Sequence, residues 1–318
     1  MQVLSRLEIE PDVPFIVRPG PVTIALVGCG GTGSRIALDL ARLAAHLRAS
    51  RQELRILFID GDTVEERNVG RQLFTPADIG RNKAQALAAR YNHLFGLGIE
   101  AYPEMATVDR LVALGGKRQR QVQRTRNDRR EQDLSILIGA VDTATARRSL
   151  HGALRQTYGE PGAQQHGWGL PQGTWDRRRC WDVWIDSGNH ERAGQVCVGT
   201  ETDPEQLTDA ILGDICTRLP APSLANPDLL VATERRRRED CAAAMEDNAQ
   251  SLEVNQMMAA IVASYLNALI IKRQILTFET WVDLEALSMR STPIRASTIH
   301  AAQERARRSA AILAEQAA

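Results

Sequence analysis

A chain of 318 residues with 43% hydrophobic side chains is long enough to bury one substantial core with a smaller appended lobe. Its 39 Lys and Arg residues balance 39 Asp and Glu residues, and this net charge of zero argues against a protein held to nucleic acid or to a membrane by its overall field. Lysine is rare in this chain, and the only lysines are Lys83, Lys117 and Lys272.

The N-terminal extension, residues 1–21, carries acids and prolines in place of the apolar core of a signal peptide. The five cysteines are odd in number, widely spaced and form no C-x-x-C pair. This pattern argues against a disulfide framework and a four-sulfur zinc site, so we expect a cytoplasmic protein without zinc.

Residues 22–27, VTIALV, predict a strand that leads into the glycine cluster GCGGTG at 28–33. A helical spacing of Ile36, Leu40, Leu43 and Leu47 follows, and residues 54–60, LRILFID, predict a second strand. This order predicts a right-handed βαβ unit. Phosphates approach backbone N–H groups at such a turn, and the candidate binding residues are Gly28, Gly30, Gly31 and Gly33.

The glycine turn alone does not select a function, since NAD-dependent oxidoreductases and ATP-binding proteins share it, and a turn without a ligand is also common. The segment after the second strand is more specific. Asp60 and Asp62 are placed to accept hydrogen bonds from ribose hydroxyls. Residues 61–82 contain Gly61, Gly70 and Gly80 and predict a long functional loop.

That loop carries the box Asn68-Val-Gly-Arg71-Gln72 and ends at Lys83, where a helix over 83–93 begins. Adenylate formation needs cations around a triphosphate. Arg71 offers a planar fork for phosphate oxygens, and Lys83 a compact charge. A cation at a helix N-terminus opposes the helix dipole, which function would explain. The alternative is that both are ordinary solvated charges.

A third strand near 99–102 precedes a weakly patterned region and an Arg-rich insertion at 115–132, which we interpret as a solvated segment or, alternatively, an electrostatic docking surface. The insertion lacks aromatic side chains for base stacking, which weakens a nucleic-acid function. Residues 135–142 predict a buried strand that ends in Asp142. A lone carboxylate there suits Mg²⁺, or else caps the helix that runs through Leu154.

Strands are predicted at 183–186 and 194–199, followed by a polar crossover region at 201–250. A helix over about 251–273 and a hairpin over 280–295 complete the domain, and a tail of 296–318 forms a loose helix. The apolar stretch from 257 to 271 is shorter than the roughly 20 residues of a membrane span, so we expect a buried helix. The predicted fold is α/β: a Rossmann-like, doubly wound, mainly parallel sheet in an ATP-binding domain over 22–200, with an antiparallel extension.

Three segments, GCGGTGS, DGDTVEERNVGRQLFTPADIGRNK and IGAVDTATAR, resemble the adenylation core of ThiF, MoeB, HesA and ubiquitin-activating enzymes. The resemblance covers roughly 22–92 and 134–200. It implies an ATP and Mg²⁺ site formed by the glycine loop, by Asp60 at the ribose, by Asn68, Arg71 and Lys83 at the phosphates, and by Asp142 at the metal.

The segments IDSGNHERAGQVCVG and CAAAMEDNAQSLEVNQMMA further resemble ThiF-family proteins of PRTRC systems. This resemblance implies a ubiquitin-like substrate protein, a conjugating-enzyme-like partner and a homodimer. Relatives carry paired zinc-binding C-x-x-C motifs, which this chain lacks. They also supply an arginine from the partner's N-terminal helix, a role for which Arg6 and Arg18 are the candidates here.

A thioester step after adenylation needs an accessible cysteine with thiolate character. Cys241, which follows the run Arg235 to Arg238, is the first candidate, and Cys216 and Cys180 come next; the alternative is an idle or buried thiol. Cys29 and Cys197 are interpreted as structural, and His190 as a loop residue that faces either solvent or substrate.

These observations favour an adenylyltransferase that activates a protein's C-terminal carboxylate. A non-catalytic adaptor with the same fold is the first alternative. An NAD-dependent oxidoreductase is the second, and it does not need the box of Asn, Arg and Lys after the second strand.

Overall fold

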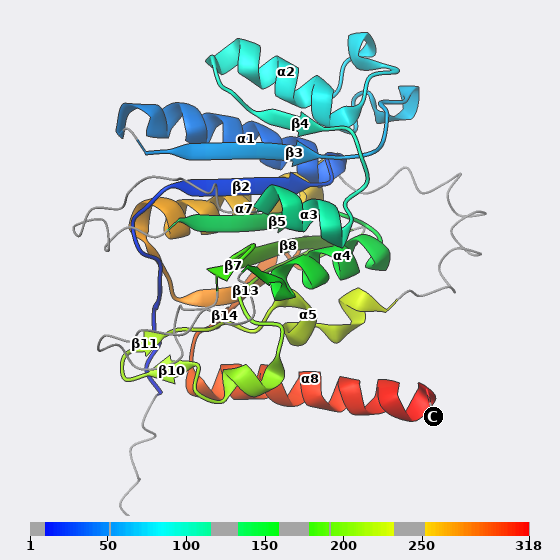
Figure 1. The fold of residues 1–318 in the computed structure, drawn as a ribbon. Coiled ribbons are helices and arrows are strands. Elements are labelled where there is room, and N and C mark those ends of the chain that lie inside the picture. The colour runs from blue at the N-terminus through cyan, green and yellow to red at the C-terminus, as the bar shows by residue number, and fades with distance from the viewer. Residues whose placement is uncertain are drawn as a thin grey trace, which may run out of the picture.

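One large sheet organises the described part of the chain (Figure 1). The computed structural model describes residues 10–50, 52–115, 133–158, 178–190, 192–231 and 252–317. Cys241, Arg6 and nearly all of the Arg-rich insertion lie outside these ranges.

The sheet has eight strands in the order β14-β13-β9-β8-β5-β2-β3-β4. Its parallel strands are β4 (Glu100–Tyr102), β3 (Leu54–Ile59), β2 (Val22–Val27), β5 (Leu134–Gly139) and β8 (Val183–Asn189). β2 and β5 are buried along almost their whole length, as expected of strands with helices on both faces.

The strand order reverses at β2. From there β3 and β4 extend the sheet to one side, and β5 and β8 extend it to the other. At such a switch point the loops that follow two neighbouring strands diverge and leave a crevice for a ligand. In this chain these are the loops after β2 and β5.

Three further strands, β9 (Ala193–Gly199), β13 (Thr277–Asp283) and β14 (Ser288–Pro293), continue the sheet antiparallel beyond β8. The predicted terminal hairpin is therefore β13 and β14. The predicted α/β fold, mainly parallel with an antiparallel extension, is confirmed.

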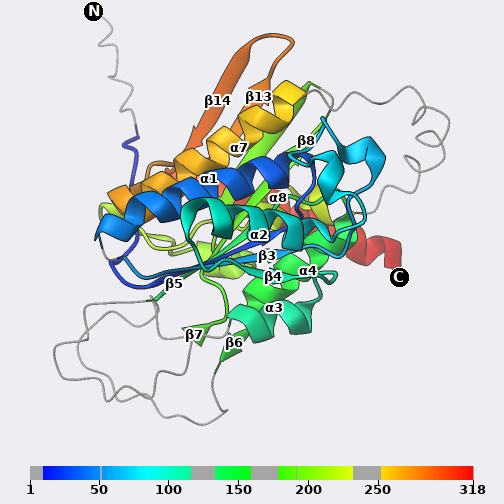
Figure 2. The same cartoon turned by 90° about the horizontal axis from the view of Figure 1, so that it is seen from above.

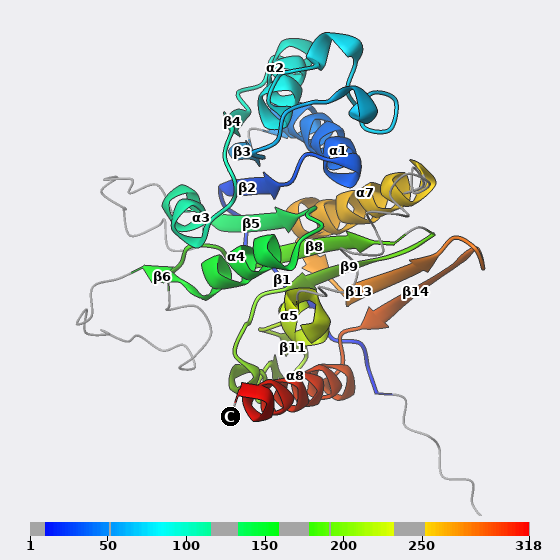
Figure 3. The ribbon, with the colours of Figure 1, turned by 90° about the vertical axis from the view of Figure 1, so that its right-hand side faces the viewer.

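Helices cover both faces of the sheet (Figures 2 and 3). One face carries α1 (Gly31–Leu47), α2 (Lys83–Phe95) and α7 (Leu252–Asn267); the other carries α3 (Val108–Gly115), α4 (Ala144–Arg155) and α5 (Pro222–Ala225). The sequence did not predict α3, which is only two turns long. It is held partly by Trp181, whose indole N–H donates to the carbonyl of Leu111 at 2.8 Å.

Smaller elements surround this core. A four-stranded sheet joins β10 (Ile211–Leu212), β11 (Ile215–Cys216), β1 (Phe15–Ile16) and β12 (Gln274–Ile275), and β6 (Thr157–Tyr158) pairs with β7 (Arg178–Arg179). The short turns are η1 (Arg48–Ser50), η2 (Glu66–Asn68), η3 (Pro76–Asp78), η5 (Pro204–Leu207) and η6 (Pro227–Leu230). The tail forms a long helix, α8 (Ala296–Ala317), that packs on α5.

α7 continues through a π-helical turn, η7 (Ala268–Lys272), and this 21-residue helix is by length and composition apolar enough to cross a membrane. It packs against α1, β8 and β9, and 56% of its apolar window is buried inside the protein. The buried helix predicted over about 251–273 is confirmed, and its observed bounds are Leu252–Lys272. Its packing in the interior accounts for its apolar composition.

Candidate active site at the switch point of the sheet

The glycine turn after β2 lies directly against the turn after β5. Gly28 has a φ of +88°, and a Cβ there would lie 2.3 Å from the carbonyl oxygen of Ala140. A Cβ on Gly33 would lie 2.0 Å from the carbonyl oxygen of Gly28. Since no side chain fits at either position, these two glycines are required by the close approach of backbone to backbone.

Gly30 is the N-cap of α1, and no side-chain hydrogen bond caps the first turn of this helix. Space is open where a Cβ on Gly30 would project. The first N–H groups of a helix have no partner within the helix, and they attract anions. A helix N-terminus of this kind can donate hydrogen bonds to a phosphate or carboxylate group.

Asp60, directly after β3, ties the glycine turn to the following loop. Its carboxylate accepts the N–H of Cys29 at 2.5 Å and the N–H of Asp62 at 2.8 Å. Burial raises the pKa of Asp60, and the two backbone N–H groups and Lys83 act in the opposite direction. Each carboxylate oxygen retains a further lone pair, so Asp60 can still accept a ribose hydroxyl.

Lys83 is the first residue of α2, and its ammonium group donates to Asp62 at 2.9 Å. The lysine side chain is 10% exposed, whereas that of Asp62 is 54% exposed. Asn82 caps α2 and also donates to the carbonyls of Asp60 and Asp62, at 2.7 and 2.9 Å. Asp62 therefore offsets the electrostatic cost of a cation at this helix N-terminus.

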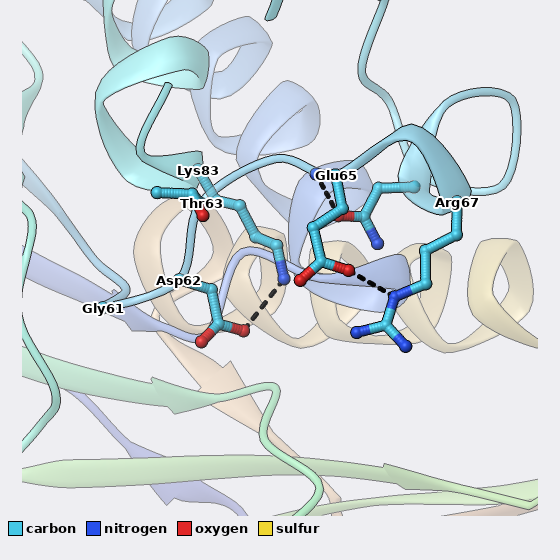
Figure 4. A pocket seen from close by; sticks show the side chains of 7 residues that line it. Gly61, Asp62, Thr63, Glu65, Arg67 and Lys83 are labelled. Carbon is cyan, nitrogen blue, oxygen red and sulfur yellow. Dashed lines mark hydrogen bonds and ion pairs between the residues drawn. The ribbon is translucent and has the colours of Figure 1, made fainter. Parts of the chain in front are cut away.

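A pocket of about 300 Å³ opens beside this ion pair (Figure 4). Its wall is formed by one stretch of the loop and the start of α2: Gly61, Asp62, Thr63, Glu65, Arg67, Asn68 and Lys83. Asn68 is buried, and its side-chain oxygen accepts the N–H of Glu65 at 2.8 Å. The sequence predicted Asp62, Asn68 and Lys83 for this site.

Glu65 and Arg67 were not predicted as part of the site. They form an ion pair with each other, and both line the pocket (Figure 4). The only signal in the sequence was their position within the loop. The spacing of charged residues in an exposed loop does not show which of them line a pocket and which face solvent.

Arg71 and Gln72 are half-buried and do not belong to the wall of this pocket. They lie in a tight turn in which Gly70 has a φ of +83°. The turn is anchored to α1, because the N–H of Leu73 donates to the hydroxyl of Ser34 at 3.2 Å. The side-chain oxygen of Gln72 is buried without a hydrogen-bond partner within the described residues.

Asp142 is exposed after β5, on the turn that packs on Gly28. The alternative that Asp142 caps the next helix is wrong, because the N-cap of α4 is Thr143, whose hydroxyl accepts the N–H of Ala146 at 3.2 Å. Among the described residues, no three His, Cys, Asp or Glu side chains gather into a metal site.

The structure adds a buried ion pair that the sequence did not predict. Asp186, in the middle of β8, is 1% exposed, and the Nε of Arg147 donates to its carboxylate at 3.2 and 3.3 Å. Burial raises the pKa of Asp186, and Arg147 counteracts this rise. The pair was hidden because 39 residues separate its members.

Both secondary cysteine candidates for a thioester are buried. Burial raises the pKa of the Cys216 thiol to about 12, and the thiol donates to the carbonyl of Arg218. Cys180 is 1% exposed. Neither offers the accessible thiolate that the step needs, so these two assignments are wrong. Cys29 and Cys197 are buried with raised pKa values, because burial disfavours the thiolate.

Two other candidates lie at the surface. His190 is exposed just beyond the end of β8, and its N–H donates to the carbonyl of Ala193 at 2.7 Å. Arg18 is exposed in the segment between β1 and β2. Neither residue lines the pocket described above.

Comparison with solved structures finds the same fold. E. coli MccB crystallised with ATP superposes with a TM-score of 0.50 at 14% identity, covering 86% of this chain and 64% of that one. PaaA gives a TM-score of 0.47 at 19% identity, with the same coverage. The chain thus spans less than two thirds of the length of these proteins. No curated protein matches the sequence.

Comparison with protein-family models gives a match over most of the chain. The model of the ThiF family matches residues 20–297, which include every strand of the large sheet and the glycine turn. The chain therefore belongs to the ThiF family.

Proposed function

We propose that this chain is an ATP-dependent adenylyltransferase that activates the C-terminal carboxylate of a small, ubiquitin-like protein and releases pyrophosphate. The observation that carries the proposal is the chain of contacts from the glycine turn through Asp60 and Asp62 to Lys83, at the switch point of the sheet. Membership of the ThiF family supports the same reaction class.

In this proposal the N–H groups at the start of α1 bind phosphate oxygens, and Asp60 accepts a ribose hydroxyl. Lys83 is held near the site by Asp62, which is the more exposed partner of the pair. Phosphate oxygens compete with Asp62 for the lysine, so the cation neutralises charge that builds up as pyrophosphate departs. Arg71, from the turn anchored on Ser34, adds a second cation.

Asp142 is the residue that would hold Mg²⁺. Magnesium typically binds one or two carboxylates together with phosphate oxygens and water, so an exposed carboxylate beside the phosphate turn fits this requirement. Bound there, the ion supplies charge neutralisation at the phosphates. The turn that carries Asp142 is fixed by the N–H of Ala140, which donates to the carbonyl of Val27 at 2.9 Å.

Pyrophosphate exchange tests this function. Labelled pyrophosphate should enter ATP when Mg²⁺ and a cognate small protein are supplied, and small proteins encoded beside this gene are the first to screen. Asp142→Ala and Arg71→Ala should each lower exchange by about 100-fold or more, the typical effect of removing one charge-stabilising group. Full exchange in Asp142→Ala would contradict the assignment.

Transfer to a thioester remains a further part of the proposal, and Cys241 is its candidate. Formation of a covalent adduct that is sensitive to thiol reagents, lost in Cys241→Ala but kept in Cys216→Ala, would support it. An adduct that survives in Cys241→Ala would contradict the role of this residue.

A further inference from the structure

The first turn of α1 carries two buried hydroxyl groups that connect it to different parts of the protein. Ser34 binds the turn that holds Arg71, through the N–H of Leu73. The hydroxyl of Thr32 instead donates to the side-chain oxygen of Asn255, on α7, at 2.7 Å. This second contact joins residues 223 positions apart in the sequence.

Asn255 is 3% exposed, and its side-chain oxygen accepts a second hydrogen bond, from the side-chain amide of Asn189 at 2.8 Å. Because both partners donate, the oxygen of Asn255 faces them and its amide nitrogen faces the other way. That nitrogen lies 2.7 Å from the point where a Cβ on Gly31 would project. Gly31 thus leaves room for the amide group of Asn255.

We propose that Asn255 is a positioning residue of the nucleotide site, which fixes the phosphate-binding turn at Gly31 and Thr32 and joins it to the end of β8 at Asn189. This inference rests on the proposed function. It extends the site to α7, a helix that belongs to none of the motifs after β2, β3 or β5.

Two physical features support this role. Hydrogen bonds in a buried, low-dielectric environment hold geometry strongly, and losing Asn255 would leave the polar groups of Thr32 and Asn189 unpaired. The NH₂ end of the Asn255 side chain also carries a partial positive charge next to the N-terminal end of α1, where an anion would bind. A negative charge at the same point would repel that anion.

Asn255→Asp separates these two features, because aspartate keeps the shape and both acceptor contacts but adds a negative charge. The measurement is the Kd of the full chain for ATP with Mg²⁺, with adenosine as a competitor that lacks phosphates. We expect ATP to bind about tenfold more weakly or worse, while adenosine binds as it does to the unmodified chain. Equal ATP affinity would overturn the inference.

Thr32 provides a second test that does not alter Asn255. Thr32→Val removes the hydroxyl that donates to Asn255 and should weaken ATP binding by about 5-fold. Thr32→Ser keeps the hydroxyl and should retain the affinity for ATP. In a double-mutant cycle, Thr32→Val and Asn255→Ala should be non-additive, since both remove one contact. Additive losses would contradict a shared role.

Asn267→Ala is the matched control, because Asn267 is the same residue type on an exposed position of the same helix. It should leave ATP affinity unchanged. If Asn255 has a purely structural role, its substitution lowers the melting temperature without changing the Kd of the folded protein for ATP. That result would overturn this inference but not the proposed function. If the unmodified chain binds no ATP, the proposed function and this inference fail together.

Discussion

The two sides of the candidate site differ in how the chain supplies their residues. On the β3 side, the pocket wall comes from one loop and the helix that follows it, residues 61–83. On the β8 side, the polar contacts join segments that lie far apart, such as Arg147 with Asp186 and Asn189 with Asn255.

This difference has a physical origin. A loop that binds a ligand can do so with local turns, and its glycines, caps and charges leave a spacing in the sequence. Contacts made by helix packing and strand register leave no such spacing, because either partner alone resembles an ordinary core residue. Substitutions that change the local backbone should therefore disturb the β3 side most, and substitutions in buried polar pairs should disturb the β8 side most.

The largest expected effect is on the glycine turn. Gly33→Ala would place a Cβ 2.0 Å from the backbone oxygen of Gly28, so the turn has to move. We expect a loss of more than about 4 kcal/mol in the free energy of unfolding, measured by urea denaturation, or failure to fold. Gly30→Ala meets open space and should keep near-normal stability while it weakens ATP binding. If both variants behave alike, the turn is not shaped as described.

Breaking the buried pair tests the β8 side. Arg147→Ala leaves the Asp186 carboxylate buried without its cation, and we expect a loss of about 3–5 kcal/mol at pH 8. Burial already raises the pKa of Asp186, and losing Arg147 raises it further. The variant should therefore regain stability relative to the unmodified chain as the pH falls through this raised pKa and Asp186 becomes protonated.

Urea unfolding of both proteins at pH 8 and pH 5 measures this difference. A deficit that is the same at both values would contradict an ionised Asp186 as the partner of Arg147.

The smallest effect separates Asp142 from its neighbour. Thr143 caps α4, so Thr143→Ala should cost about 1 kcal/mol. Asp142→Ala should change stability by less than about 0.5 kcal/mol, as is usual for an exposed side chain, although it should lower pyrophosphate exchange by about 100-fold or more. A larger loss of stability in Asp142→Ala than in Thr143→Ala would indicate that Asp142 has a structural role.

Sequence patterns predicted much of the fold. The spacing of apolar residues predicted the alternating strands and helices and the long apolar helix, and the glycine cluster predicted the first turn. The predicted elements correspond to β2, α1, β3, α2, β5 and α7. The helix α3 and the four-stranded small sheet were missed. α3 is two turns long, and the small sheet consists of two-residue strands brought together from distant segments.

The candidate site divides in the same way. Lys83, Asp62 and Asn68 were predicted from one loop and line one pocket. Arg71 and Asp142 lie on two other turns outside the wall of this pocket, so the sequence predicted the region of the site better than its individual contacts. The Arg147–Asp186 pair and Asn255 could not be predicted, because their partners are set by the register of β8 and the packing of α7 on α1.

Calorimetric titration of the full chain with ATP tests the central claim most directly. We predict that ATP binds with an affinity that depends on Mg²⁺, that Lys83→Ala and Asp142→Ala each weaken this binding, and that NADH does not compete. Tight binding of NADH without binding of ATP, or ATP binding that is unaffected by both substitutions, would contradict a triphosphate site at this switch point.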